Sequence, residues 1–214
     1  MDSDIFSILP TLTFDAPPVV LEIGAATGSD TDKIFNLLKP AEYFAFEPDP
    51  RNIAVFKSFP IVRSIGVQLI QCAVGSGNGV SNFHQSTGWN SHFNCEHTLS
   101  GSLKSPKKHL TAFPHAEFKE TITVRVIRLD DFIDLFSIPK IGFIWCDVQG
   151  AEDLVIQGGT EALSLTKYFF TEYYEEEMYE GQIGAEEIHR RLPGTWEVVH
   201  KWEADILFRN TAIE

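Results

Sequence analysis

Residues 19–30 read VVLEIGAATGSD, an apolar run that ends in a turn with glycine at positions 24 and 28. The run is short and turn residues bound it, so it predicts a buried strand rather than a helix. Apolar residues then recur at helical spacing over 34–38, and Ser29 or Asp30 stands where a side chain can cap the first turn of that helix. The stretch therefore predicts a strand, a tight loop and a helix, in that order.

The loop of this unit has features of a nucleoside-binding turn. Glycine at 24 and 28 lets the backbone bend sharply and approach a ligand closely. Residues 43–46 predict a second strand, and Glu47 follows it at 47 − 28 = 19 residues past Gly28, near the spacing of about 20 at which an acidic side chain holds ribose hydroxyls. The loop has neither the Gly-x-Gly-x-x-Gly fingerprint nor the Lys-Ser/Thr ending of a phosphate-binding loop. A ligand without phosphates, such as S-adenosylmethionine, fits better; the alternative is a purely structural glycine turn.

Composition restricts the class of protein and its partners. The 214 residues are enough for one sizeable core, so we expect a single domain over 1–214. The net charge of −13 would repel phosphate backbones, and no run of about 18 apolar residues predicts a membrane span. We therefore expect neither a nucleic-acid nor a membrane partner. Three cysteines at irregular spacing, with Cys72 and Cys146 in apolar runs as buried thiols, favour a reducing, cytoplasmic setting.

Further along the chain, strands alternate with helices, which predicts a parallel sheet with helices on both faces. The predicted strands are 67–74, 121–127, 141–146, 168–173, 196–199 and 204–208, and the predicted helices are 51–58, 129–136, 150–158 and 185–192. In the first of these helices Ile53, Val55 and Phe56 are core candidates. Residues 76–118 are polar and lack periodicity, so we predict an irregular insertion there that covers the active site.

Small or polar residues stand at the ends of five predicted strands. They are the loop 22–28, Glu47, Ala73 with Val74, Asp147, and Glu172. Ligands of open parallel sheets bind beyond the carboxyl ends of the strands. The sequence therefore predicts one crevice at which these residues meet.

The segment around Asp147 carries a more specific sequence pattern. Residues 143–152 read FIWCDVQGAE and a Gly-Gly pair follows at 158–159, while FEP at 46–48, AVG at 73–75, GSL at 101–103 and LDDF at 129–132 complete the pattern. From about 19 to 175 the chain resembles FkbM-type methyltransferases, members of the class I methyltransferase superfamily. One position departs from that family, which has glutamate where this chain has Gln149.

The resemblance implies a Rossmann-like α/β fold with a doubly wound, mostly parallel seven-stranded sheet. It also implies methyl transfer from S-adenosyl-L-methionine to a hydroxyl of a sugar or small natural-product acceptor. Glu47 would bind the ribose, the loop would pass under the methionine part, Glu22 would hold the loop or face the ammonium group, and Ala73-Val74 would flank adenine. The residues expected to bind the cofactor are Glu22, Gly24, Ala25, Ala26, Gly28, Glu47, Pro48, Ala73, Val74 and Asp147.

For catalysis we predict Asp147, between cofactor and acceptor, and His109 as the base that removes the acceptor proton. Asp147 has an alternative as a cap for the helix that follows it. Glu172 either orients the acceptor hydroxyl or begins a solvated acidic run.

His84, His92, Cys95 and His97 are zinc-ligand types, but their spacing matches no common zinc pattern and we expect no metal. Trp89 and Phe93 either cover the acceptor pocket or pack under a loop. Two other functions stay open. Because Gln149 replaces the family glutamate, the protein could have a degenerate methyltransferase fold that only binds partners. A nicotinamide-dependent oxidoreductase is disfavoured, because the Gly-x-Gly-x-x-Gly fingerprint is missing.

Overall fold

The computed structural model describes residues 4–58, 66–90 and 95–213. Its centre is a seven-stranded sheet in the order β11-β12-β10-β9-β1-β2-β3, in which β12 alone runs in the direction opposite to the other strands. This confirms the predicted mostly parallel sheet. The strands are β1 Val19–Ile23, β2 Glu42–Phe46, β3 Val67–Ile70, β9 Ile141–Cys146, β10 Thr166–Glu172, β11 Trp196–Lys201 and β12 Asp205–Asn210.

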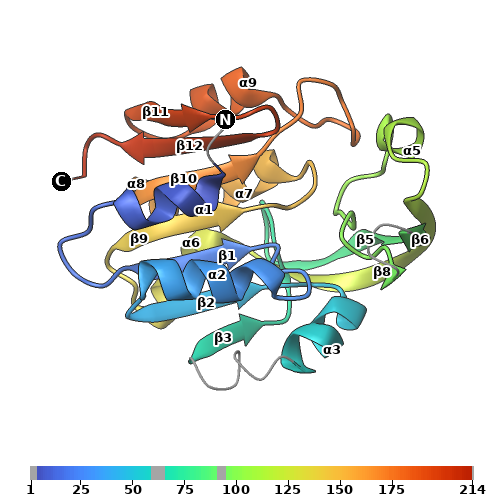
Figure 1. Cartoon of the computed structure of the whole chain (residues 1–214), viewed down its shortest axis with the longest axis horizontal. Coiled ribbons are helices and arrows are strands. Elements are labelled where there is room, and N and C mark those ends of the chain that lie inside the picture. Colours follow the sequence, from blue (N-terminus) through green and yellow to red (C-terminus); the bar gives the residue numbers. More distant parts are fainter. Residues whose placement is uncertain (1–3, 59–65, 91–94, 214) are drawn as a thin grey trace.

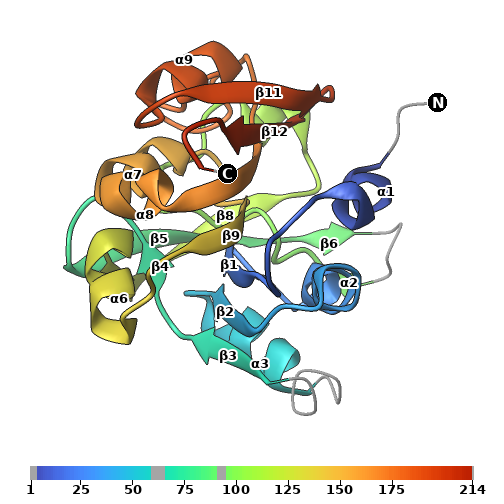
Figure 2. The same ribbon diagram turned by 90° about the vertical axis from the view of Figure 1, so that its left-hand side faces the viewer.

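Helices cover both faces of the sheet (Figures 1 and 2). One face carries α1 Ile5–Ile8, η1 Leu9–Thr11, α2 Ser29–Leu38 and α3 Pro50–Ser58, and the other carries α6 Leu129–Phe136, α7 Glu152–Gly158, α8 Thr160–Ser164 and α9 Ala185–Arg191. Because both faces are covered, the central strands are apolar without alternation. All six residues of β9 are buried.

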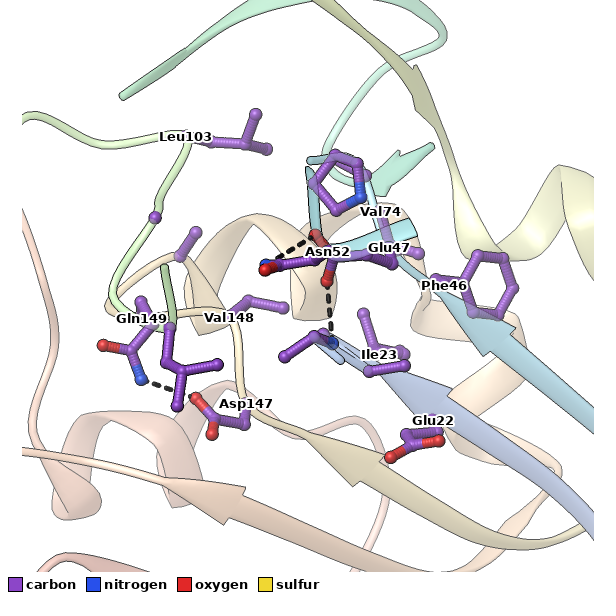
Figure 3. Close-up of a pocket in the computed structure, with 18 of the residues that line it drawn as sticks. Glu22, Ile23, Phe46, Glu47, Asn52, Val74, Leu103, Asp147, Val148 and Gln149 are labelled. Carbon is purple, nitrogen blue, oxygen red and sulfur yellow. Dashed lines mark hydrogen bonds between the residues drawn. The ribbon is translucent and has the colours of Figure 1, made fainter. Parts of the chain in front are cut away.

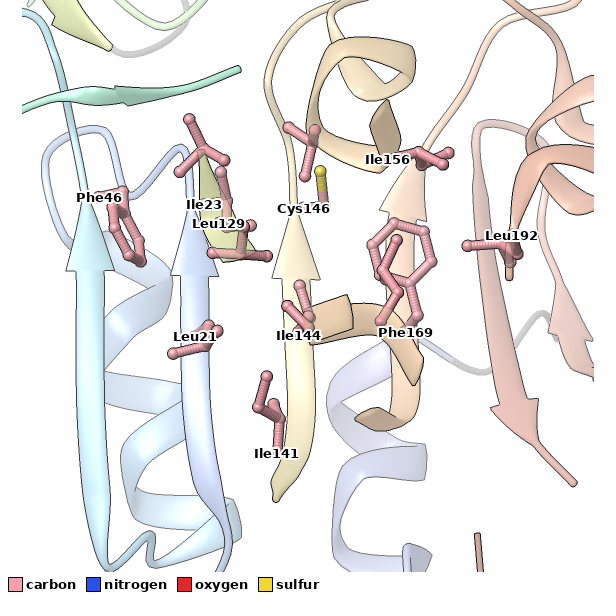
Figure 4. Close-up of a cluster of buried hydrophobic side chains, with 14 of the residues drawn as sticks. Leu21, Ile23, Phe46, Leu129, Ile141, Ile144, Cys146, Ile156, Phe169 and Leu192 are labelled. Carbon is pink, nitrogen blue, oxygen red and sulfur yellow. The ribbon is translucent and has the colours of Figure 1, made fainter. Parts of the chain in front are cut away.

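The larger core lies under α6, α7, α8 and α9. Leu21 and Ile23 of β1 point to this side, together with Ile144 of β9 and Phe169 of β10 (Figure 4). Val20 points to the opposite core, under α1 and α2. The period of two along β1 thus supplies both cores and fixes the register in which its carboxyl end meets the neighbouring strands.

A second, three-stranded sheet forms an arm, residues 73–127, that extends beside the main sheet (Figure 1). It contains β4 Ala73–Val74, β5 Gly79–Thr87 and β8 Glu117–Ile127, with β5 and β8 antiparallel. The arm also holds the short pair β6 Trp89–Asn90 and β7 Cys95–Glu96, and the helix α5 His109–Ala112. The predicted insertion 76–118 is therefore not irregular, because β5 occupies its first part.

The single strand predicted over 67–74 is wrong. The chain turns after β3, where the N–H of Cys72 donates to the carbonyl of Ile70 at 2.9 Å, and β4 then pairs with β8 in the arm. The turn residues Gln71 and Cys72 continue the mixture of polar and apolar residues seen in β3, so periodicity could not reveal the break. The strand predicted over 121–127 is confirmed as part of the longer β8.

Local details differ from the predictions at three places. Neither Ser29 nor Asp30 caps α2, because Gly28 occupies the cap position and no side chain bonds there. Val55 is 44% exposed, whereas Ile53 and Phe56 are buried as predicted. Helix α8 was not predicted. It begins directly after the Gly158-Gly159 pair at which α7 ends, and that pair was interpreted only as the end of a helix.

Cys72 and Cys146 are buried free thiols, as predicted. His92 and Phe93, and the side chain of Cys95, lie outside the described residues. Across the described ranges, no helix has both the length and the apolar character needed to span a membrane. The same part of the chain contains no group of three or more His, Cys, Asp or Glu side chains arranged to hold a metal ion.

Candidate active site

A cavity opens at the carboxyl ends of β1, β2 and β9, and we call it the strand-end cavity (Figure 3). All of the predicted cofactor residues except Gly28 line it. The main sheet and its loops contribute Glu22, Ile23, Gly24, Ala25, Ala26, Ser29, Asp30, Phe46, Glu47, Pro48, Asn52, Cys72, Trp145, Asp147, Val148, Gln149 and Ala151, and the arm contributes Ala73, Val74, Phe83, Thr98, Leu99, Gly101 and Leu103. The segment 76–118 thus forms one wall of this cavity.

Gly24 allows the backbones of two strands to meet at the bottom of the strand-end cavity. Its φ is +90°, and a Cβ at this position would lie 1.8 Å from the carbonyl oxygen of Asp147. The N–H of Asp147 donates to the carbonyl of Ile23 at 2.9 Å, and the N–H groups of Gly24 and Ala25 donate to the carbonyl of Phe46. Only glycine fits this close approach.

Gly28 serves the fold rather than the lining of the strand-end cavity. It has φ +85°, and a Cβ there would lie 2.8 Å from the ring of Phe56. Its small size therefore lets α2 begin against α3, and its predicted role in cofactor binding has no contact with the cavity lining to support it.

Glu47 reaches back under the glycine loop. Its Oε2 accepts from the N–H of Ala26 at 2.8 Å, and its Oε1 accepts from the N–H of Asp49 at 2.8 Å. The side chain is 4% exposed, and burial raises the pKa of the carboxyl to about 7. Oε2 keeps a further lone pair with which to accept a hydrogen bond.

Asn52 lies beside Glu47 and was missed by sequence reasoning (Figure 3). Its Nδ2 donates to the Thr98 carbonyl at 3.2 Å and to Glu47 Oε1 at 3.4 Å, which fixes the orientation of the amide. Its Oδ1 is buried and has no partner among the described residues. Asn52 stands one helical turn before the buried Phe56 and so lies on the same, inward face of the helix. A polar residue on that face is the signal that would have identified it.

Glu22 is fully buried and holds three elements together. Its Oε2 accepts from the Thr31 hydroxyl at 2.6 Å and from the Tyr43 hydroxyl at 2.9 Å, so it joins β1 to α2 and β2. Burial raises the pKa of this carboxyl to about 8. Of the two roles predicted for Glu22, these contacts favour the one that holds the loop.

Asp147, Gln149 and Glu172 form a polar cluster next to the strand-end cavity. Gln149 Nε2 donates to Asp147 Oδ1 at 2.7 Å and to Glu172 Oε2 at 2.8 Å. The alternative of Asp147 as a helix cap is not seen, because Ala151 holds the cap position of α7 and the Gly150 N–H donates to Glu152. The alternative of Glu172 as a solvated residue is not seen either, since Glu172 is half-buried and hydrogen-bonded.

Negative charge on one carboxyl group of this cluster disfavours negative charge on the other. Burial raises the pKa of Asp147. Burial, and after it the charge of Asp147, raises the pKa of Glu172 well above its ordinary value. The two carboxyls therefore favour a state in which Glu172 keeps a proton and Asp147 is charged.

His109 lies outside the strand-end cavity, in an aromatic cluster with Phe113, Phe118 and Tyr179 at ring-centroid distances of 4.8, 5.3 and 5.2 Å. Burial lowers the pKa of His109 to about 4. The Tyr179 hydroxyl contacts Gln149 Oε1 at 3.1 Å, so Tyr179 stands between His109 and the cavity lining. His109 as the base stays a prediction, and its position gives that role no support.

Trp89 is not among the residues that line the strand-end cavity, and its side chain is 61% exposed. Neither of the two roles predicted for it, covering the acceptor pocket or packing under a loop, is therefore seen. His84 and His97 make separate contacts. His84 faces Thr121 and Ser105, whereas His97 Nε2 lies 2.7 Å from Ser100 Oγ.

Comparison with known proteins shows which protein family this chain resembles. Residues 22–202 match the methyltransferase FkbM domain. The chain is 39% identical over 202 residues to 2-O-methyltransferase NoeI of Sinorhizobium fredii (strain NBRC 101917 / NGR234), and that alignment covers 92% of this chain and 81% of that protein.

Solved structures share the fold at low identity. Methyltransferase FkbM from Methylobacillus flagellatus KT matches with a TM-score of 0.55 and 14% identity, covering 94% of this chain and 47% of that one, so the chain spans about half its length. An rRNA methylase from Streptococcus thermophilus matches with a TM-score of 0.53 and 10% identity over 98% of both chains. The putative methyltransferase SMU.1697c from Streptococcus mutans, solved in complex with SAH, matches with a TM-score of 0.50 and 10% identity over 98% of this chain and 99% of that one.

Proposed function

The chain is a methyltransferase of the FkbM family, and on that premise we propose that it transfers the methyl group of S-adenosylmethionine to a hydroxyl oxygen of a sugar or small natural-product acceptor. The observation that carries the proposal is the strand-end cavity, where the glycine loop, Glu47 and Asp147 meet. The name of the 39% identical relative, a 2-O-methyltransferase, supports oxygen as the target atom.

The residues of the strand-end cavity fit S-adenosylmethionine. Glu47 and the unpartnered Asn52 Oδ1 offer neighbouring hydrogen-bond acceptors, which suit the two hydroxyl donors of a ribose. Gly24, Ala25, Ala26 and Ala73 leave space along the lining. No cationic side chain is among the lining residues of the described chain, which agrees with a ligand without phosphates.

Each group of residues would bind a different part of S-adenosylmethionine. Glu47 and Asn52 would hold the ribose, the backbone from Gly24 to Ala26 would lie along the methionine part, and Ala73 with Val74 would flank the adenine. When bound, S-adenosylmethionine supplies an electrophilic methyl group that needs no further activation.

The chain's own task is then to align the acceptor, exclude water and accept a proton. Asp147 lines the cavity and carries the charge of its cluster, so we assign it the role of proton acceptor. Phe83, Leu99 and Leu103 of the arm form an apolar wall opposite the sheet, and this wall would exclude water from the site.

The acidic chain, with a net charge of −13, favours a small or carbohydrate acceptor over a nucleic acid. The rRNA methylase among the structural matches does not alter this, since at 10% identity it indicates the fold alone. Buried free Cys72 and Cys146 support a reducing, cytoplasmic setting.

Isothermal titration calorimetry with S-adenosylmethionine and, separately, S-adenosylhomocysteine (SAH) tests the proposal. We expect micromolar binding of both ligands, abolished by Glu47→Ala. Glu42→Ala is the matched control, because Glu42 is an exposed glutamate at the opposite end of the same strand. Absence of binding by folded wild-type protein, or equal binding by Glu47→Ala, would overturn the assignment of the site.

A further inference from the structure

The Gln149 amide uses each of its polar groups on a functional neighbour. Its Nε2 donates to one oxygen of Asp147 and one of Glu172, at 2.7 and 2.8 Å, and its Oε1 accepts from the Tyr179 hydroxyl at 3.1 Å. The Nε2 donors face two carboxyl oxygens, and Oε1 faces the Tyr179 hydroxyl, which shares its hydrogen with the Ser100 carbonyl at 2.8 Å, so these contacts favour this orientation of the amide. Gln149 thus bridges two acidic side chains that come from different strand ends.

The backbone at this point is held in an uncommon conformation. Gln149 has φ +54° and the following Gly150 has φ +88°. Non-glycine residues rarely adopt positive φ. A Cβ at Gly150 would lie 2.8 Å from the Tyr179 ring, so Tyr179 packs directly on this turn as well as bonding the amide. The turn and the tyrosine together determine where the Gln149 side chain lies.

The groups that surround Asp147 and Glu172 are acidic or neutral. Asp30 faces them from α2, Glu152 from α7 and Asp205 from β12, while Tyr174 OH donates to Glu172 Oε1 at 3.3 Å. Lys104 of the arm acts on Glu152. In such surroundings a second negative charge on the two carboxyls is costly, and the neutral amide of Gln149 bonds both without adding one.

We propose that Gln149 is a positioning residue, whose amide holds Asp147 and Glu172 as one carboxyl pair that carries a single proton, with Asp147 facing the acceptor hydroxyl. The proposal rests on the proposed function. Asp147 and Gln149 line the strand-end cavity, whereas Glu172 lies behind them. Glutamate at position 149 would place a third carboxyl between the other two.

The pair gives the acceptor proton a destination. The acceptor O–H bond breaks, the proton forms an O–H bond on Asp147, and the electron pair left on the oxygen forms the bond to the methyl carbon. The sulfonium sulfur keeps the electrons of its broken bond to that carbon. The pair, which began with one proton and one negative charge, ends with two protons and no charge.

An infrared pH titration of protonated carboxyl groups in the whole protein tests the proposal, without ligand and again with SAH. We expect the wild type to show, beside the protonated carboxyls of Glu22 and Glu47, a further protonated carboxyl that Glu172→Gln removes. Gln149→Glu and Gln149→Met, which add a charge or delete the donor, should each move its titration upward by about 1 to 3 pH units.

Gln182→Glu is the matched control. Gln182 Oε1 accepts from the N–H groups of Met178 and Tyr179, so this variant adds the same charge on the loop that carries Tyr179 and makes no contact with the pair. Its titration should stay at the wild-type pH. A titration that is unchanged in Gln149→Glu and Gln149→Met, or moved equally in Gln182→Glu, would overturn the proposal. Failure of SAH to bind would instead count against the proposed function, since the titration is also measured without ligand.

Discussion

Replacement of Gly24 by alanine tests how the strand-end cavity is built. The added Cβ would lie 1.8 Å from the Asp147 carbonyl oxygen, and ordinary contact begins at 3.4 Å, so the two backbones must separate by 3.4 − 1.8 = 1.6 Å. Such a shift breaks the hydrogen bond from Asp147 N–H to the Ile23 carbonyl, worth about 1 kcal/mol. Overpacking of a tight contact adds about 1–3 kcal/mol, and the left-handed backbone adds about 1–2 kcal/mol for alanine.

We therefore expect Gly24→Ala to lower the free energy of unfolding by about 3–6 kcal/mol, the sum of these contributions. Gly194→Ala is the matched control, because Gly194 has φ +85° and nothing within 4 Å of its Cβ position. This control should lose only the backbone cost of about 1–2 kcal/mol.

Urea denaturation without ligand gives both free energies, and calorimetry with SAH reports the cavity. Gly24→Ala should also bind SAH at least about tenfold more weakly, because Asp147 and the glycine loop move apart. Equal loss of stability in the two variants would refute the close approach of β1 and β9 as the reason for glycine at position 24.

Three further outcomes follow from other contacts. Asn52→Leu should weaken SAH binding about tenfold in calorimetry, since it removes an acceptor worth about 1.4 kcal/mol. Because burial raises the pKa of Glu22 from 4.5 to about 8, the folded protein holds a proton that the unfolded chain releases, and stability falls as pH rises between these values. Glu22→Gln should therefore gain thermal stability over wild type at about pH 8 and not at about pH 4. Arg51→Met should cost about 3 kcal/mol in urea denaturation, because it leaves the fully buried Asp49 without its cation.

Each of these outcomes has a result that would contradict it. Unchanged SAH affinity in Asn52→Leu would mean that Asn52 only joins α3 to the arm. A Glu22→Gln variant with the same pH dependence as wild type would remove Glu22 from the acid–base balance of folding. For Arg51, adding Asp49→Asn to Arg51→Met should recover most of the loss, and an additive loss would mean that packing, not charge, dominates.

The parts of the fold that sequence predicted well are those with local signals. β9 is a continuous apolar run, and β1 is one apart from Glu22, because helices cover both of their faces. The turn at Gly24 and Glu47 at the end of β2 follow from chain order in a parallel sheet, which brings successive carboxyl ends to one edge. For this reason Gly24, Glu47 and Asp147 on the sheet side of the strand-end cavity could be predicted, whereas Asn52 could not.

Apart from the strand over 121–127, the arm could not be predicted, because its signals are not local. β5 buries Phe83, Gln85 and Ser86 within a polar sequence, so it lacks the apolar alternation of a half-buried strand. Gln85 is buried because its Nε2 donates to Asp49 Oδ1 at 2.9 Å, 36 positions away in sequence. A polar residue whose partner lies that far along the chain reads as a loop residue when only its neighbours are considered.

The same reasoning explains why the sheet side of the strand-end cavity was predicted better than its arm side. Residues of the arm reach the sheet through long-range hydrogen bonds, from Asn52 to Thr98, from Arg51 to Ser86 and from Tyr179 to Ser100. Tyr179 joins the arm to Gln149 by one hydroxyl, so the arm and the carboxyl pair share a contact that no periodicity encodes. His109 was selected for its position in sequence near a motif, and the fold instead puts Tyr179 between it and the site. We therefore propose the proton acceptor at the strand ends, where Asp147 and Glu172 meet, and His109 as the base stays a prediction.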